Sequence, residues 1–235
     1  MVYNWAKYIQ TKLYPASCVL CGAAGDLELD LCRPCRQELP HNRCCCPRCA
    51  LPLPPSAFPE TSCGSCQRQQ PVFQRSLCPY LYHAPLDWLI GGLKFNGRLL
   101  YARLLGELLG DFVAQQSTTL PDLLIPVPLH RSRLRQRGYN QALEIARPLA
   151  RRFKIPIEYQ ACVRQRETAP QAELERATRQ TNMRGAFRLT GEIKARHVAI
   201  VDDVVTTGAT VSELARTLRK AGVKQMEVWA VARTP

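Results

Sequence analysis

The spacing of apolar residues changes along the chain and separates two regions of different character. After residue 78, apolar side chains recur every three or four positions in several stretches, a period typical of helices with one buried face. This period predicts helices over residues 86–95, 99–113, 140–153 and 210–221. Short unbroken apolar runs between them predict buried strands over residues 80–83, 122–127, 198–205 and 226–231.

Strands and helices therefore alternate through the second region. This order is typical of an α/β fold with a mainly parallel sheet and helices on both faces. We expect Pro148 to bend the third helix, because proline removes a helical hydrogen bond, and Gly222 to end the fourth. Ligands of such sheets bind beyond the carboxyl ends of the strands.

The first region has few apolar runs and is instead rich in cysteine. Eleven of the twelve cysteines lie between Cys18 and Cys78. Eight of them form four Cys-x-x-Cys pairs, which are Cys18 and Cys21, Cys32 and Cys35, Cys46 and Cys49, and Cys63 and Cys66. Two thiolates at this spacing can share one tetrahedral zinc ion, so the pairs predict two four-cysteine sites. Sequential and interleaved combinations both fit, and Cys44 or Cys45 could replace Cys46.

A structural role for zinc is the simpler interpretation of these pairs. Sites made only of cysteine leave no open position for a catalytic water. Because the segment lacks long apolar runs, metal binding would supply much of its folding free energy. One site with spare cysteines is the alternative to two sites. Cys78 and Cys162 stand outside the pairs, and we expect them to be buried as small apolar residues.

The first seventeen residues carry apolar side chains at helical spacing, at Trp5, Tyr8, Ile9 and Leu13. We expect a short docked helix there, with a membrane-surface anchor as the weaker alternative. The sequence shows neither an export signal nor an apolar stretch of ~18 residues, so we expect a cytoplasmic chain without a transmembrane segment. The expected division is a helix at 1–17, a double zinc-ribbon-like domain at 18–78 and an α/β domain at 79–235.

Basic residues outnumber acidic ones by 32 to 19, which gives a net charge of +13. Most of the surplus lies after residue 78, and no block resembles a basic tail. A positive surface suits phosphates, nucleotides or nucleic acid, although a solvated basic face would have the same composition. The hydrophobic fraction of 46% excludes a mainly disordered chain.

The end of the strand predicted at 198–205 is the most informative place in the chain. Its apolar residues lead to two adjacent carboxylates, Asp202 and Asp203, which call for cations or hydroxyls as partners. A helix follows directly after five small or hydroxyl-bearing residues, which are Thr206, Thr207, Gly208, Ala209 and Thr210. Backbone N–H groups and a helix N-terminus attract a phosphate. The pattern therefore predicts a site for a ribose 5-phosphate, and the sequence contains no GxxxxGK[ST] or GxGxxG that would favour another nucleotide fold.

The segment 198–210 resembles the phosphoribosyl-pyrophosphate (PRPP) motif of type I phosphoribosyltransferases. The whole chain resembles the ComF/GntX family of bacterial competence and DNA-utilisation proteins. This resemblance covers nearly all 235 residues and includes the cysteine pairs, LKFNGR at 93–98, IPVPLHRSRLRQRGYNQA at 125–142 and spaced residues from Thr168 to Phe187. It implies that residues 79–235 form a phosphoribosyltransferase-like domain behind the zinc-binding one.

The resemblance also implies roles for individual residues. Asp202 and Asp203 would bind the ribose hydroxyls directly or through Mg²⁺, and residues 206–210 would hold the 5-phosphate. Lys94, Arg137, Gly138 and Arg179 are placed to meet the pyrophosphate or to belong to the closing loop. Residues 164–184 would form that mobile loop, which excludes water from bound PRPP. A charged surface helix is the competing interpretation of the same segment.

Four arginines alternate along the segment before the third helix, at Arg131, Arg133, Arg135 and Arg137. If this segment is extended, they share one face. Such a cationic strip could hold pyrophosphate or a DNA backbone, and a solvated loop is the plainer interpretation.

Three functional hypotheses remain open at this point. The chain is a phosphoribosyltransferase with an unidentified acceptor, a PRPP-binding accessory factor that performs no transfer, or a zinc-based module that binds nucleic acid or a helicase. The family resemblance implies uptake or nutritional use of DNA, with single-stranded DNA or a DNA-uptake helicase as candidate partners. Hypoxanthine-type enzymes have an aspartate at the position of Thr206, so no general base can be assigned and the purine class is not implied.

Overall fold

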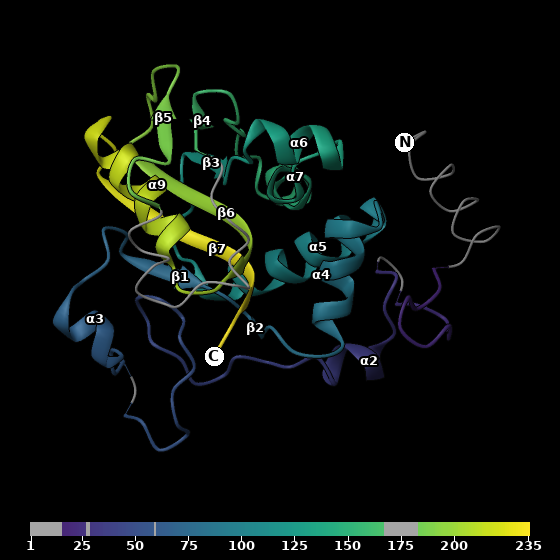
Figure 1. The fold of residues 1–235 in the computed structure, drawn as a ribbon. Coiled ribbons are helices and arrows are strands. Elements are labelled where there is room, and N and C mark those ends of the chain that lie inside the picture. The colour runs from purple at the N-terminus through teal and green to yellow at the C-terminus, as the bar shows by residue number, and fades with distance from the viewer. Residues whose placement is uncertain (1–15, 27–28, 59, 167–182) are drawn as a thin grey trace.

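The computed structural model describes residues 16–26, 29–58, 60–166 and 183–235 (Figure 1). The helix expected around Trp5 therefore lies outside the described residues. So do Arg179 and nearly all of the loop expected at 164–184.

The core of the fold is a parallel five-stranded sheet, as the alternation of elements predicted. Its longest strands, β6 (His197–Val205) and β7 (Gln225–Arg233), pair with each other along most of their length. Strand β3 (Leu123–Pro126) pairs with β6 on the outer side. On the other side of β7 lie β1 (Arg75–Leu77) and then β2 (Tyr80–Leu81), both parallel to β7.

Strand β1 was not predicted from the sequence. Its three residues, RSL, include two polar side chains, so it lacks the apolar run that identifies a buried strand. It forms because Glu227 and Arg75 lie opposite each other in the register with β7, together with Leu77 opposite Trp229. The expected strand at 80–83 is present as the shorter β2.

Helices cover both faces of the sheet. One face packs against α4 (Leu86–Phe95), α5 (Leu99–Gln116) and α7 (Gln141–Phe153). The other packs against α9 (Ala209–Lys220) and the antiparallel pair β4 (Cys162–Arg164) and β5 (Phe187–Leu189). Figure 1 shows α9 on one side of β6 and β7, and α5 and α7 on the other.

The alternation of side chains along the two long strands decides which core each residue joins. Ala199 and Val201 of β6 belong to the core beneath α4, α5 and α7. Val198 and Ile200 belong to the core beneath α9. All four are fully buried. A strand that is covered on both faces needs apolar residues at successive positions, which explains the apolar run of β6. Helix α7 continues through Pro148, which packs against Gly106 of α5.

The segment with alternating arginines is helical rather than extended, so the condition for a strip on one face is not met. Residues Arg131–Arg137 form a helix, α6, whose amino end is capped by the His130 side chain. Arginine and glutamine are good helix formers, and Gly138 ends the helix with a left-handed φ of 84°. In a helix, residues four apart share a face, so Arg133 and Arg137 form one pair and Arg131 and Arg135 another.

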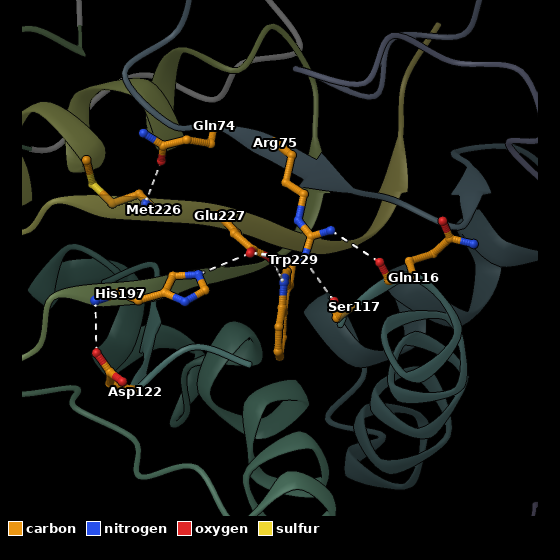
Figure 2. Close-up of polar contacts among 9 residues, drawn as sticks. All are labelled: Gln74, Arg75, Gln116, Ser117, Asp122, His197, Met226, Glu227 and Trp229. Carbon is orange, nitrogen blue, oxygen red and sulfur yellow. Dashed lines mark hydrogen bonds and ion pairs between the residues drawn. The ribbon is translucent and has the colours of Figure 1, made fainter. Parts of the chain in front are cut away.

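The buried carboxylate of Glu227 connects three strands near the amino end of the sheet, as Figure 2 shows. Glu227 of β7 is 1% exposed. Its carboxylate pairs with Arg75 of β1 at 3.0 Å, contacts His197 of β6 at 3.1 Å and accepts a 3.0 Å hydrogen bond from the Trp229 indole. A buried charge with this many partners fixes the register of three strands. Asp122 adds a further link, because its carboxylate accepts a hydrogen bond from the backbone N–H of His197 at 3.0 Å.

The cysteine-rich region contains two short helices, α2 (Arg33–Gln37) and α3 (Gly64–Arg68). It joins the sheet through an antiparallel bridge between His41 and Tyr80, and through the buried Asn42, whose backbone N–H donates to Pro79. In the part of the chain that the structure describes, no helix combines the length and the apolar character needed to cross a membrane.

Candidate phosphoribosyl and metal sites

Strand β6 carries Asp202 and Asp203 to its carboxyl end, where both are buried, at 8% and 3% exposed. Asp202 accepts a hydrogen bond from the backbone N–H of Asp203 at 2.9 Å. Asp203 pairs with the ammonium group of Lys94 from α4 and accepts a 3.3 Å hydrogen bond from Gln141 of α7. Three elements that are distant in sequence therefore meet at this carboxylate pair.

The two carboxyl groups have pKa values that move in opposite directions. Burial raises the pKa of Asp202 well above its ordinary value, and the neighbouring charge of Asp203 adds to this effect. Burial also raises the pKa of Asp203, but Lys94 outweighs it and leaves that pKa lowered. One carboxylate is thus held charged beside a cation, while the other retains its proton more firmly. Such a pair can bind a metal ion or a diol.

Residues 206–208 follow the end of β6 and form a turn into α9, whose first residues are Ala209 and Thr210. Gly208 is the N-cap and has a left-handed φ of 76°, a conformation that costs little only for glycine. The Thr207 hydroxyl accepts a 3.3 Å hydrogen bond from the N–H of Ala209. The amino end of a helix carries the positive end of the helix dipole. We call residues 206–210 the phosphate loop.

A pocket of about 290 Å³ opens beside the acid pair. Its lining brings together three of the residues selected from the sequence, Lys94, Arg133 and Arg137, and Arg133 lies one helical turn before Arg137. The complete lining comprises Lys94, Phe95, Gly97, Arg133, Gln136, Arg137 and Tyr139. The three cations of this lining, Lys94, Arg133 and Arg137, which we call the cationic wall, make the pocket suitable for an anion of several charges.

The cations of this wall are coupled to the acids. Burial lowers the pKa of Lys94, but Asp203 outweighs it and leaves that pKa above its ordinary value. Burial lowers the pKa of Arg137, which Asp203 only partly offsets. The Arg137 guanidinium also donates to the side chain of Gln141 and lies 5.8 Å from the centre of the Phe95 ring. These contacts fix the wall before any ligand arrives.

Several residues around the pocket were not singled out from the sequence. Tyr139 donates from its hydroxyl to the Leu93 carbonyl and so joins the start of α7 to α4. Asn140 caps α7 by accepting from Ala142 N at 3.0 Å, and it donates to Val127 O at 3.0 Å. Gln141 reaches Asp203. The motif GYNQA at 138–142 contained the signal, but a role for each residue requires the folded geometry.

The eight paired cysteines gather into two clusters in sequential order. The first cluster contains Cys18, Cys21, Cys32 and Cys35, and the second contains Cys46, Cys49, Cys63 and Cys66. In each, all four sulfur atoms lie within 4.8 Å of one another. The 3.6 Å separations of Cys21 from Cys32 and of Cys49 from Cys63 are close to the ~3.8 Å edge of a tetrahedron with Zn–S near 2.3 Å. Both clusters are compatible with a structural zinc ion.

Backbone N–H groups surround the sulfur atoms in both clusters. Burial alone would raise the pKa of Cys18, yet N–H groups including that of Cys21 outweigh it and lower the pKa to about 6. The same balance lowers the pKa of Cys46 to about 7. Hydrogen bonds of this kind stabilise thiolates, which are the form that binds metal. Cys78 and Cys162 lie outside the clusters and are buried, as expected.

Comparison with known proteins assigns both regions. Residues 9–67 match the double zinc ribbon domain, and residues 140–235 match the phosphoribosyl transferase domain. The chain is 37% identical over 225 residues to the DNA utilization protein YhgH of Escherichia coli O157:H7, an overlap that covers 94% of this chain and 98% of that protein. The chain belongs to the ComF/GntX family.

Another relative is named competence protein F, from Haemophilus influenzae. It is 38% identical over 178 residues, which cover 73% of this ComF/GntX chain and 78% of the relative. Among solved structures, the chain aligns with a glutamine PRPP amidotransferase from Bacillus subtilis at a TM-score of 0.36 and 24% identity, over 54% of this chain and 25% of that chain. The family assignment does not depend on this structural overlap.

The candidate site of this ComF/GntX protein lies only partly within the region that matches the phosphoribosyl transferase domain. The phosphoribosyl transferase match begins at Asn140 and includes the acid pair and the phosphate loop. Lys94, Arg133 and Arg137, which form the cationic wall, lie before it. The double zinc ribbon match includes all eight clustered cysteines. The wall is therefore contributed by the segment between the two matched regions.

Proposed function

We propose that this chain binds PRPP with Mg²⁺ and acts in the use or uptake of DNA. One observation carries the proposal: an acid pair, a phosphate loop and a cationic pocket meet at the carboxyl edge of one parallel sheet. In this proposal, Asp202 and Asp203 hold the ribose hydroxyls directly or through Mg²⁺. Residues 206–210 hold the 5-phosphate, and Lys94, Arg137 and Gly138 meet the pyrophosphate.

The chemistry of the donors fits this ligand. Carboxylate oxygens are the hard donors that Mg²⁺ prefers, and Asp203 is the acid kept charged. Arg137 and Arg133 present guanidinium groups, which bind phosphate oxygens in a forked geometry. Lys94 pairs with Asp203 in the absence of ligand. A pyrophosphate in the pocket would offer Lys94 a second anionic partner and leave Asp203 available to the ribose side.

We further propose that the site transfers phosphoribose to a nitrogen of an unidentified acceptor. The bond from C1 of the ribose to pyrophosphate would break, and a bond from C1 to the acceptor would form. The cationic wall would stabilise the departing pyrophosphate, so that positioning and electrostatics supply most of the catalysis. Thr206 has no carboxylate for a base proton, and we assign no general base.

The zinc ribbon completes the proposal. We assign one zinc ion to each four-cysteine cluster, in a structural role, because four thiolates leave no position for a reacting water. The chain would then comprise a segment at 1–17, a zinc-binding domain at 18–78 and a phosphoribosyltransferase-like domain at 79–235. We place it in the cytoplasm, where thiols stay reduced and available to metal.

Calorimetric titration of Mg-PRPP into the zinc-loaded full chain tests the binding. Asp203→Asn should weaken binding at least tenfold, because a neutral amide replaces the charged ligand group. Asp87→Asn is the matched control, since Asp87 lies at the start of α4 and accepts only a local hydrogen bond from the N–H of Trp88 among its described contacts. Absence of PRPP binding by the unmodified chain would reject the proposal.

Pyrophosphate release then separates an enzyme from an accessory factor. The assay offers Mg-PRPP with bases, nucleosides and single-stranded DNA fragments in turn. Release that depends on one acceptor and disappears in Asp203→Asn supports transfer. Binding without release for every acceptor supports a PRPP-binding accessory role.

A second candidate is the binding of single-stranded DNA next to the pocket. It is favoured by the exposed guanidinium side of α6, formed by Arg131 and Arg135, and by Phe95, which is 75% exposed. Cations track a nucleic-acid backbone and aromatic rings stack on bases. Replacing Arg131 and Arg135 by glutamine should weaken DNA binding and reduce its salt dependence. An unchanged affinity would exclude this side of α6 as the DNA-binding surface.

A further inference from the structure

A buried arginine connects the second cysteine cluster to the phosphate loop. Arg233 ends β7 and is 3% exposed. On one side its Nε donates to the Cys49 carbonyl at 3.1 Å. On the other its Nη1 donates to the Val205 carbonyl at 3.1 Å and also to the Thr206 carbonyl. A single guanidinium therefore contacts a cluster residue, the last residue of β6 and the first residue of the phosphate loop.

These carbonyls lie where regular secondary structure ends. Val205 and Arg233 form the last paired positions of β6 and β7. Beyond them the chain turns away into the loop, so carbonyls at this edge need partners outside the ladder. Arg233 supplies donors to both, and the N–H of Thr234 adds a 3.1 Å hydrogen bond to Val205 O. The guanidinium thus fixes the direction in which the chain leaves β6.

The turn that follows Cys49 packs in the same core as residues of the loop. Ala50, which follows Cys49, is fully buried in the same core as Val205 and Ala209, the first residue of α9. Asn42 holds this turn by donating to the carbonyls of Ala50 at 2.9 Å and Cys78 at 3.2 Å. The first cluster belongs to the opposite core, beneath α4 and α5. Ala50, directly after Cys49, therefore shares a core with the phosphate loop, whereas Cys18 and Cys32 of the first cluster lie in the other core.

The buried positive charge of Arg233 is a second reason to connect this residue with the metal of the second cluster. Within the described residues, all of its hydrogen-bond acceptors are carbonyl or hydroxyl oxygens. A buried cation without a carboxylate partner is costly unless another negative charge lies close by. A zinc ion bound by four cysteine thiolates has a net negative charge. The loaded second cluster, which Arg233 contacts through Cys49, would supply it.

We propose that Arg233 is a positioning residue that couples the second cluster to the phosphate loop, so that the loop keeps its phosphate-binding shape only while that cluster holds its metal. The identity of the ligand rests on the proposed function, but the coupling does not. Loss of metal would release the turn at Cys49, and Arg233 would then lose its hydrogen bond to the Cys49 carbonyl.

Hydrogen exchange on the zinc-loaded full chain tests the role of Arg233. In Arg233→Lys, the peptide covering residues 205–211 should exchange about tenfold faster, since an ammonium cannot reproduce the forked contacts. Zinc content should remain that of the unmodified chain. Arg75→Lys is the matched control, because Arg75 pairs with Glu227 at the opposite end of the sheet (Figure 2). Unchanged exchange of this peptide in Arg233→Lys, or an equal increase in Arg75→Lys, would overturn the proposal.

A second comparison tests the metal itself. Cys49→Ser removes a ligand of the second cluster, and Cys21→Ser removes one of the first. Only Cys49→Ser should speed exchange at residues 205–211, and it should also weaken Mg-PRPP binding by about tenfold, the loss expected when a hydrogen bond to a charged group is broken. Equal exchange of residues 205–211 in the two variants would contradict the coupling. If the unmodified chain does not bind PRPP, the proposed function fails, while the exchange comparison still decides the coupling.

Discussion

Replacing Lys94 by methionine removes the cation that compensates Asp203 while it keeps most of the side-chain volume. Removing one partner of a fully buried ion pair costs about 3–5 kcal/mol. The Asp203 side chain is 4% exposed, but that of Lys94 is 22% exposed, so water takes over part of the lost interaction. Because Arg137 also remains near Asp203, we expect a loss of about 2–3 kcal/mol in the free energy of unfolding at neutral pH.

The direction of the pH dependence follows from the two acids. With Lys94 present, the pKa of Asp203 is lowered although burial would raise it. Without Lys94, the largest influence that lowers the pKa of Asp203 is lost and burial raises that pKa, so the native state then binds more protons than the unfolded chain. Stability of the variant should therefore fall as pH rises through the raised pKa. The deficit relative to the unmodified chain should be larger at pH 8 than at pH 6.

Urea unfolding of the zinc-loaded chain, followed by tryptophan fluorescence at both pH values, measures the effect. Lys194→Met is the matched control, because Lys194 pairs with Glu192 on the surface and both side chains are more than three-quarters exposed. An exposed pair of this kind contributes under about 1 kcal/mol. Equal losses in Lys94→Met and Lys194→Met, or a Lys94→Met deficit that does not grow with pH, would refute the reasoning.

Four further outcomes are expected. Metal analysis should find two zinc ions per chain, and alanine at one cysteine of either cluster should lower the count by one. Gly208→Ala should cost about 1 kcal/mol by thermal unfolding and weaken Mg-PRPP binding, because φ at Gly208 is left-handed. Asn140→Ala should cost about 1 kcal/mol by removing the cap of α7. Glu227→Gln should cost about 2 kcal/mol in urea unfolding, because His197 and Arg75 then face a neutral amide; the exposed Glu192→Gln should cost little.

The parts of the fold that could be predicted are those whose sequence pattern has one physical explanation. Strand β6 is an apolar run that is buried on both faces, and α9 follows it within one residue of the predicted start. Strand β1 and helix α6 were missed for the opposite reason. The polar residues of β1 are stabilised by partners on β7, and the alternating arginines of α6 satisfy a period of two without being extended.

The site divides in a similar way. Asp202, Asp203 and the phosphate loop are contiguous, so their chemistry can be interpreted from a single segment. The contact between Lys94 and Asp203 joins residues more than a hundred positions apart, and the link from Arg233 to Cys49 spans an even greater separation. The spacing and the periodicity of residues along the sequence do not reveal such contacts, because the contacts depend on how α4 and the cysteine clusters pack on the sheet. The combination of the cysteine pairs into clusters also depends on the folded structure, so the sequence alone could not choose between the sequential and interleaved combinations.

The arrangement of the two clusters gives the combination of zinc ribbon and α/β domain a physical rationale. The first cluster shares its core with α4, through Cys18, Cys32 and Leu89, and α4 ends near Lys94. Arg36 of the ribbon also pairs with Asp111 of α5 at 2.6 Å. In our proposal, the second cluster supports the phosphate loop through Arg233, which contacts both Cys49 and Thr206. Each side of the acid pair is thus supported by a different cluster, so loss of either metal should loosen a different half of the pocket, with Lys94 affected in one case and residues 206–210 in the other.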